Sequence, residues 1–279
     1  MKKNAVIVLL FFGLLLLVAC KSQSSWTLKA SEFDELPNSI GNISTQHDSP
    51  FDFSGAFNEG IAEKTEYENP TEKWFLTGFS ISAGNHLPGE EVQIQLEQHP
   101  DDLIIRYQLT ERNASLEKIN LVKEEVNTNH QFKTNLPDKE GALYLLSAEV
   151  LDKNEQVEDT LLSLVGVPLQ SMNAKLYTDK EAYHPNDTVL LQLENFGPTN
   201  LSFGAPYFLE RFENNKWQRL LFENKGFESI GITLEPNNIY EQSVDLPNLP
   251  QGKYRIVKSF NGEGTELDAT LATNFKVIE

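Results

Sequence analysis

Cysteine is almost absent from this chain, because Cys20 is the only one among 279 residues. A single thiol cannot form an intramolecular disulfide. The common catalytic signatures are missing as well: there is no Gly-x-Ser-x-Gly elbow, no phosphate-binding loop and no dinucleotide-binding glycine motif. Carboxylates are so numerous that their number alone does not indicate a glycosidase pair. We therefore expect no catalytic residues and a protein that is not an enzyme.

Patterns that hold metal ions are also lacking. The five histidines, none spaced from another like the ligands of a zinc helix, are His47, His86, His99, His130 and His184. One stretch alternates oxygen-bearing side chains like a calcium loop: Asp152, Asn154, Gln156 and Glu158. It lacks the glycine that makes the sharp turn of such a loop, so a polar hairpin turn explains it more simply. We expect no metal and no cofactor.

Basic residues are few, with 23 Lys and Arg against 41 Asp and Glu and a formal net charge of −18. This balance argues against nucleic acid as a partner, and equally against a general attraction to anionic lipid or phosphate-rich wall polymer; we expect no nucleic-acid partner. A local exception is the strand that contains Lys253, Arg255 and Lys258. We interpret it as a charged outer face or as partners for acids across the strand. An anion or wall-polymer site is the alternative.

The first twenty residues have the order of a secretory signal. Lys2 and Lys3 precede an uncharged apolar stretch over residues 5–19, and polar residues follow Cys20 at once. The apolar stretch is shorter than the roughly twenty residues that a spanning helix needs. The pattern therefore predicts a signal peptide over residues 1–19 that is removed before Cys20.

The end of that stretch, Leu17, Val18, Ala19 and Cys20, resembles the lipobox of bacterial lipoproteins. The resemblance implies that the Cys20 thiol takes a diacylglyceryl group and becomes the first mature residue. Buried acyl chains contribute about 0.8 kcal/mol per methylene, so two long chains make a stable anchor. We expect a protein attached to the cell membrane through lipidated Cys20, on the extracytoplasmic face.

Residues 20–70 lack a sustained hydrophobic period and contain turn clusters and acidic side chains. We predict that they form a lipidated, flexible and mostly disordered tether that lifts the rest of the chain off the bilayer. Phe51, Phe53 and Phe57 are the exception, and docking on the first domain explains them better than a partner-binding motif.

From residue 71 onward the apolar residues recur with period two, which is typical of half-buried strands. Val92, Ile94 and Leu96 form one such set, and a second set follows over residues 103–109; the two strands are antiparallel neighbours if residues 99–102 form a hairpin. Residues 114–126 are compatible with a short helix. Strands at intervals of about ten residues predict an all-β chain with two tandem immunoglobulin-like sandwiches, over residues 71–168 and 169–279.

The C-terminal part carries a family resemblance in a series of short motifs that recur in a fixed order. They are Leu193-Glu194-Asn195, Phe203-Gly204, Tyr207, Leu209-Glu210, Trp217, Leu234-Glu235-Pro236 and Gly252-Lys253-Tyr254-Arg255. This part resembles a bacterial immunoglobulin-like domain found at the C-terminal end of secreted proteins and lipoproteins of Gram-positive bacteria. The resemblance implies a sandwich without catalytic residues. Residues 71–168 resemble it in architecture only.

Together these features predict a lipid-anchored envelope protein whose immunoglobulin-like modules serve binding or spacing. The candidate interaction surface, for a protein or cell-wall partner, consists of Tyr207, Trp217, Lys253 and Arg255. Burial of Trp217 in the core is the alternative for that residue. The alternative function is an accessory protein or hydrolase that acts on cell-wall material. A solute-binding lipoprotein is disfavoured because alternating strands and helices are missing.

Overall fold

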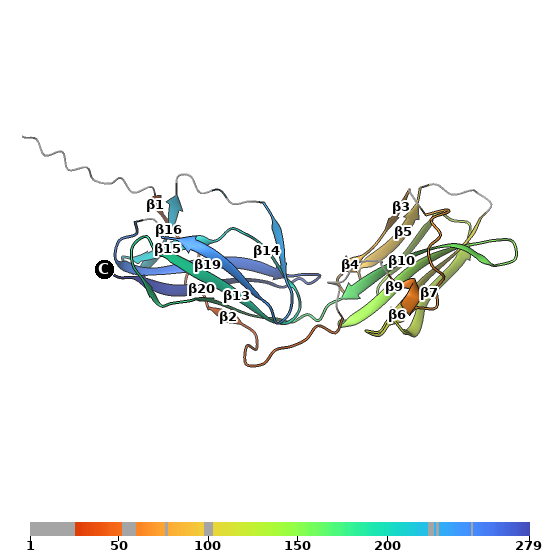
Figure 1. Ribbon diagram of the computed structural model, residues 1–279, viewed down its shortest axis with the longest axis horizontal. Helices are drawn as coiled ribbons and strands as arrows, with labels where there is room; N and C mark the ends of the chain where they lie inside the picture. Colours follow the sequence, from red (N-terminus) through yellow and green to blue (C-terminus); the bar gives the residue numbers. More distant parts are fainter. Residues whose placement is uncertain are drawn as a thin grey trace, which may run out of the picture.

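The computed structural model describes residues 26–51, 60–75, 78–97, 103–222, 226, 229–246 and 248–279. These residues form twenty β-strands and one short 3₁₀ helix, η1 (Ala62–Lys64). Figure 1 shows two β-sandwiches placed end to end. The predicted fold class, all-β with two tandem immunoglobulin-like sandwiches, is confirmed. No helix in the described part of the chain is long and apolar enough to cross a membrane. The predicted signal peptide and Cys20 lie outside the described residues.

The N-terminal sandwich packs a five-stranded sheet against a three-stranded one. The larger sheet has the order β4 (Gly84–Asn85), β10 (Val157–Val167), β9 (Ala142–Leu151), β6 (Ile104–Arg112) and β7 (Lys118–Asn127). The smaller sheet has the order β3 (Phe79–Ile81), β5 (Glu91–Leu96) and β8 (Gln131–Asn135). Alternate residues of both sheets fill the core, where the rings of Tyr107 and Phe132 stack with centroids 5.5 Å apart.

Two local arrangements that the sequence left open for this sandwich do not occur. β5 and β6 do not form a hairpin, because β5 pairs with β3 and β8 in one sheet while β6 pairs with β7 and β9 in the other. The short helix considered for residues 114–126 is absent, because most of that stretch forms β7. Antiparallel pairing with β6 satisfies its backbone there, and tertiary pairing of this kind overrides weak local propensity.

The C-terminal sandwich also has two sheets. The first has the order β1 (Trp26–Ala30), β16 (Lys216–Phe222), β15 (Phe208–Glu213), β19 (Gly252–Gly262), β14 (Leu201–Gly204) and β17 (Gly231–Leu234). In the same sheet β20 (Asp268–Val277) pairs with β19, and β12 (Ala182–Tyr183) pairs with β20. The second has the order β18 (Ile239–Asp245), β13 (Thr188–Pro198), β11 (Met172–Thr178) and β2 (Ser39–Ile40). Val189, Leu191 and Leu193 on β13 belong to the same core as Tyr254 and Ile256 on β19.

Residues 26–51, which we name the strap, belong to this fold. The first strand of the strap, β1, pairs antiparallel with β16, so that Trp26 lies opposite Phe222. Its second strand, β2, pairs with β11 in the opposite sheet. The strap ends at Phe51, which is 8% exposed and packs with Ile61 on the N-terminal sandwich. The prediction of a flexible tether is therefore wrong for the described residues between 26 and 70, and the C-terminal sandwich includes two strands that precede the predicted boundary at 169.

Candidate functional site

The structure buries most of the predicted interaction surface. Tyr207 and Trp217 are each 6% exposed and Arg255 is 1% exposed, whereas Lys253 is exposed. The prediction that Tyr207, Trp217 and Arg255 present a contact surface is therefore wrong, and the alternative of a buried Trp217 holds. The physical reason lies in the strap, because its residues 31–35 cover Trp217 and Arg255 on the outer side of the first sheet.

Arg255 on β19 is the centre of a contact cluster that we name the latch. Its Nε donates a hydrogen bond of 2.7 Å to Glu210 Oε2 on the neighbouring strand β15. Its other two nitrogens donate to the backbone carbonyls of Phe33 and Asp34, at 3.0 and 2.7 Å. Ser31 Oγ donates to the other Glu210 oxygen at 2.6 Å. The latch thus uses a buried ion pair to hold the strap, and the interpretation that this basic strand pairs with acids across the strand is confirmed for Arg255.

Aromatic contact extends the latch. The Arg255 guanidinium lies 4.3 Å from the centroid of the Trp217 ring, and Lys253 Nζ lies 5.2 Å from it. Trp217 Nε1 donates to Glu35 Oε1 of the strap at 3.3 Å. Cation–π attraction of this kind is stronger where the cation has lost its water. Three of the four predicted surface residues therefore lie together: Trp217, Lys253 and Arg255. Their contacts stabilise the sandwich and hold the strap.

Lys258 is the third basic residue of β19 and is 1% exposed. Its Nζ donates to the carbonyls of Gly204 and Pro206 at 3.0 and 3.4 Å and to Gln242 Oε1 at 3.3 Å. Among the described residues it has no carboxylate partner within 4.0 Å. Burial lowers the pKa of Lys258 to about 8, because a low-dielectric environment disfavours the charged ammonium.

In the N-terminal sandwich, Asp159 on β10 holds a chain segment in place, as Arg255 holds the strap in the C-terminal sandwich. Its two oxygens accept four backbone N–H groups, from Thr71, Trp74, Phe75 and Thr160, at 2.7 to 3.2 Å. Burial acts to raise the pKa of Asp159, but these donors outweigh it and the pKa is lowered. The ionised carboxylate therefore fixes the chain segment that leads into this sandwich.

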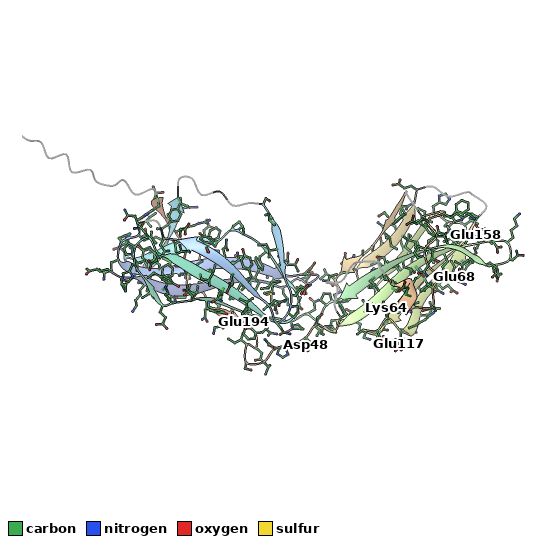
Figure 2. The ribbon with its side chains drawn as sticks, viewed as in Figure 1. Asp48, Lys64, Glu68, Glu117, Glu158 and Glu194 are labelled. Atoms are coloured by element: carbon green, nitrogen blue, oxygen red, sulfur yellow. The ribbon has the colours of Figure 1, made fainter. Side chains whose placement is uncertain are left out.

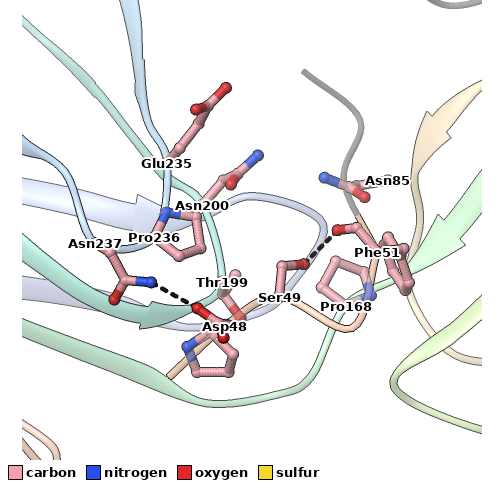
Figure 3. Close-up of a pocket in the computed structure, with 11 residues that line it drawn as sticks. Asp48, Ser49, Phe51, Asn85, Pro168, Thr199, Asn200, Glu235, Pro236 and Asn237 are labelled. Atoms are coloured by element: carbon pink, nitrogen blue, oxygen red, sulfur yellow. Dashed lines mark hydrogen bonds between the residues drawn. The ribbon is translucent and has the colours of Figure 1, made fainter. Parts of the chain in front are cut away.

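A pocket of about 220 Å³ lies where the two sandwiches meet (Figure 3). Its wall comes from three parts of the chain: the strap, the N-terminal sandwich and the C-terminal sandwich. The lining residues are Asp48, Ser49, Phe51, Asn85, Pro168, Pro198, Thr199, Asn200, Glu235, Pro236 and Asn237. Asn237 Nδ2 donates to Asp48 Oδ1 at 2.8 Å across it, and Ser49 Oγ donates to the carbonyl of Phe51 at 2.6 Å. The lining has two carboxylates and no basic side chain.

Close backbone contacts hold this junction together. A Cβ added to Gly197 would lie 1.9 Å from the carbonyl oxygen of His47, and one added to Gly264 would lie 2.5 Å from Asn85 Cβ. Both glycines have positive φ, +72° and +68°, which other residues rarely adopt. Thr199 Oγ1 also donates to the Leu169 carbonyl at 2.6 Å. The turn between β19 and β20 and the strap therefore both fit closely at the joint.

The alternating oxygen ligands considered for calcium form a hairpin turn between β9 and β10, as the simpler interpretation predicted. Asp152 Oδ1 accepts the backbone N–H groups of Asn154 and Gln156 at 2.7 and 2.8 Å. Glu158 accepts from Lys73 and the Trp74 indole instead. Within the described ranges there is no group of three or more His, Cys, Asp or Glu side chains that could hold a metal ion.

Sequence reasoning missed the strap and its latch, although a signal was present. Trp26, Leu28 and Ala30 alternate with Thr27 and Lys29 in the pattern of a half-buried strand. This alternation covers only five residues, so the turn clusters and acidic residues that follow it obscured it.

A comparison with protein families identifies the C-terminal sandwich. The family described as "Bacterial Ig-like domain" matches residues 170–276, so the predicted resemblance of this part to such a domain is confirmed. No curated protein matches the chain.

Solved structures that match this chain include the fibronectin(III)-like modules of Clostridium thermocellum CbhA, with 11% identity over 71% of this chain and 93% of that chain and a TM-score of 0.33. The adhesin InvE of Yersinia pseudotuberculosis has 11% identity over 72% of this chain and 59% of that chain, with a TM-score of 0.33. Red sea bream transglutaminase has 11% identity over 72% of this chain and 31% of that chain, with a TM-score of 0.26.

Proposed function

We propose that this protein is anchored by lipid on the extracytoplasmic face of the cell membrane, where its tandem sandwiches serve as a binding or spacing module without catalysis. The observation that carries the proposal is the position of Cys20. It ends a signal-like stretch, and only residues 21–25 separate it from Trp26, where the folded body begins. A lipid on Cys20 thus attaches directly to a folded body.

The elongated arrangement supports a spacing role. The sandwiches lie end to end, with acidic side chains over both of them and Asp48 between them (Figure 2). The strap crosses from one sandwich to the other, through the hydrogen bond of Asp48 with Asn237 and the burial of Phe51. Such continuous contacts make a stiffer spacer than two domains on an open linker.

The use of the buried charges supports a role without catalysis. Arg112 on β6 pairs with Glu66, Arg255 pairs with Glu210, and Asp159 accepts backbone N–H groups. Each of these contacts fastens a segment that crosses the outside of a sheet. Their charges therefore stabilise the fold, and immunoglobulin-like folds commonly host recognition on their loops and edges.

The experiment that tests the anchor is the change Cys20→Ala, followed by cell fractionation and metabolic labelling with palmitate. The parent protein should remain in the membrane fraction after an alkaline wash and should carry the label. The variant should keep the uncleaved signal or leave the membrane, and should carry no label. A variant that stays membrane-bound and labelled like the parent would overturn the proposal.

A further inference from the structure

The strap begins at one edge of the C-terminal sandwich. All five residues of β1 pair with β16, from Trp26 opposite Phe222 to Ala30 opposite Gln218. The segment that follows is held by the latch and by β2 on the opposite sheet. This edge of the sandwich is therefore the point at which the chain from Cys20 enters the fold.

The distance from Cys20 to this edge has a strict upper limit. Six Cα–Cα steps join Cys20 to Trp26, and an extended chain spans at most about 3.5 Å per residue, or roughly 20 Å here. The N-terminal sandwich lies at the other end of the molecule (Figure 1). The N-terminal sandwich thus comes first along the sequence, but the C-terminal sandwich is the one that lies next to Cys20 in space.

We propose that the β1–β16 edge of the C-terminal sandwich faces the lipid bilayer and that the N-terminal sandwich is carried outward. The inference rests on the proposed lipid anchor. The domain that comes last in the sequence is then the one nearest the membrane, and the outward surfaces available to other molecules belong to residues 78–167. The strap, residues 26–51, is part of the folded structure, whereas the sequence predicted a flexible tether over residues 20–70.

The composition of this edge suits a lipid surface. Leu221 on β16 is 40% exposed, and Lys29 on β1 is exposed and paired with Glu32. Trp26 is half-buried at the start of β1, and Trp is enriched at the interface between membrane and water. An outer leaflet at this edge would also cover the open side of β1, which is the terminal strand of its sheet.

Energy transfer to lipid tests the orientation. The mature chain has no cysteine besides lipidated Cys20, so one introduced cysteine takes one donor dye. Full lipidated chains with Thr27→Cys, Lys29→Cys or Asn154→Cys are placed in vesicles of phosphatidylethanolamine and phosphatidylglycerol that contain acceptor-labelled lipid. Thr27 and Lys29 lie on the β1 edge, and Asn154 lies in the exposed β9–β10 turn of the N-terminal sandwich. Circular dichroism confirms that each variant is folded.

The donors at positions 27 and 29 should lose most of their emission, while the donor at 154 should keep most of it. Ten Gly and Ser residues inserted after Ser25 should restore emission at position 27, because they release the edge from the membrane. Equal quenching at 27 and 154, or stronger quenching at 154, would overturn the orientation. A chain that starts at residue 21, and so lacks both the apolar signal and Cys20, is the control: if it still binds the vesicles and is still quenched at 27, the lipid anchor is overturned and the orientation stands.

Discussion

Arg255 and Glu210 form an ion pair between neighbouring strands, with Arg255 Nε 2.7 Å from Glu210 Oε2 and each side chain only 1% exposed. Removing one partner of such a pair leaves an uncompensated buried charge and typically costs about 3–5 kcal/mol. Arg255 also donates to two carbonyls of the strap. The pair therefore couples the stability of the sandwich to the position of residues 26–40 of the strap.

The change Arg255→Met should lower the free energy of unfolding by about 3–5 kcal/mol, because Glu210 stays buried without its cation. Urea unfolding followed by intrinsic fluorescence measures this loss. Lys29→Met, which removes one partner of an exposed ion pair with Glu32, is the matched control and should change stability little. The double variant Arg255→Met, Glu210→Leu should lose less than the sum of the two single changes. A loss for Arg255→Met as small as that for Lys29→Met would contradict the latch.

Lys258 should make stability depend on pH above neutrality. Its folded pKa is lowered to about 8 from the ordinary value of 10.5, so the folded state favours the neutral amine and the unfolded state binds more protons between these values. The free energy of unfolding should therefore rise as the pH increases from 8 toward 10, with a slope of up to about 1.4 kcal/mol per pH unit.

Urea titrations of the parent and of Lys258→Met at several pH values in this window measure the effect. The window ends near pH 10 because burial raises the pKa of Tyr207 and Tyr254 above their ordinary value of 10, so these tyrosines stabilise the fold less as the pH rises further. The variant should show a flatter profile than the parent. Parallel profiles for the two proteins would show that Lys258 is not the titrating group.

The change Trp217→Ala separates a structural role from a binding role for the most prominent predicted contact residue. Trp217 is 6% exposed and packs edge-on against Phe212, with ring centroids 5.1 Å apart. Its truncation should cost about 3–5 kcal/mol of stability, measured by thermal unfolding. Leu221→Ala on the same strand, with its side chain 40% exposed, should stay within about 0.5 kcal/mol of the parent. If the two variants were equally stable, Trp217 would not be a core residue and would again be a candidate contact residue.

Alternation of apolar residues predicted much of the fold correctly. Val92 and Ile94 on β5, and Val189 and Leu191 on β13, point into cores as expected, with exposures of 1% or less. The same pattern does not say which sheet a strand joins. β5 and β6 lie in different sheets, and the period-two pattern of apolar residues is the same for two strands of one hairpin and for two strands of different sheets.

The predicted surface failed for a related reason. Tyr207 belongs to the core between the two sheets. Trp217 and Arg255 lie on the outer face of their sheet, and that face is covered by residues more than 170 positions earlier in the chain, such as Ser31 and Glu35. Local sequence carries no information about a cover that arrives from so far away. The assignment of Cys20 depends on the sequence motif alone and stays a prediction.

Hydrogen exchange of the mature chain tests the central claim most directly, because that claim makes residues 26–40 part of the C-terminal sandwich. Peptides that span residues 26–40 are followed by mass spectrometry in the folded protein and in urea. The structure predicts that amides of β1 and β2, together with the Ser31 amide that donates to the Trp217 carbonyl at 3.2 Å, exchange much more slowly in the folded protein. Exchange of these peptides at the urea rate would mean that the segment is a free tether, and the C-terminal sandwich would then no longer be tied to the membrane side.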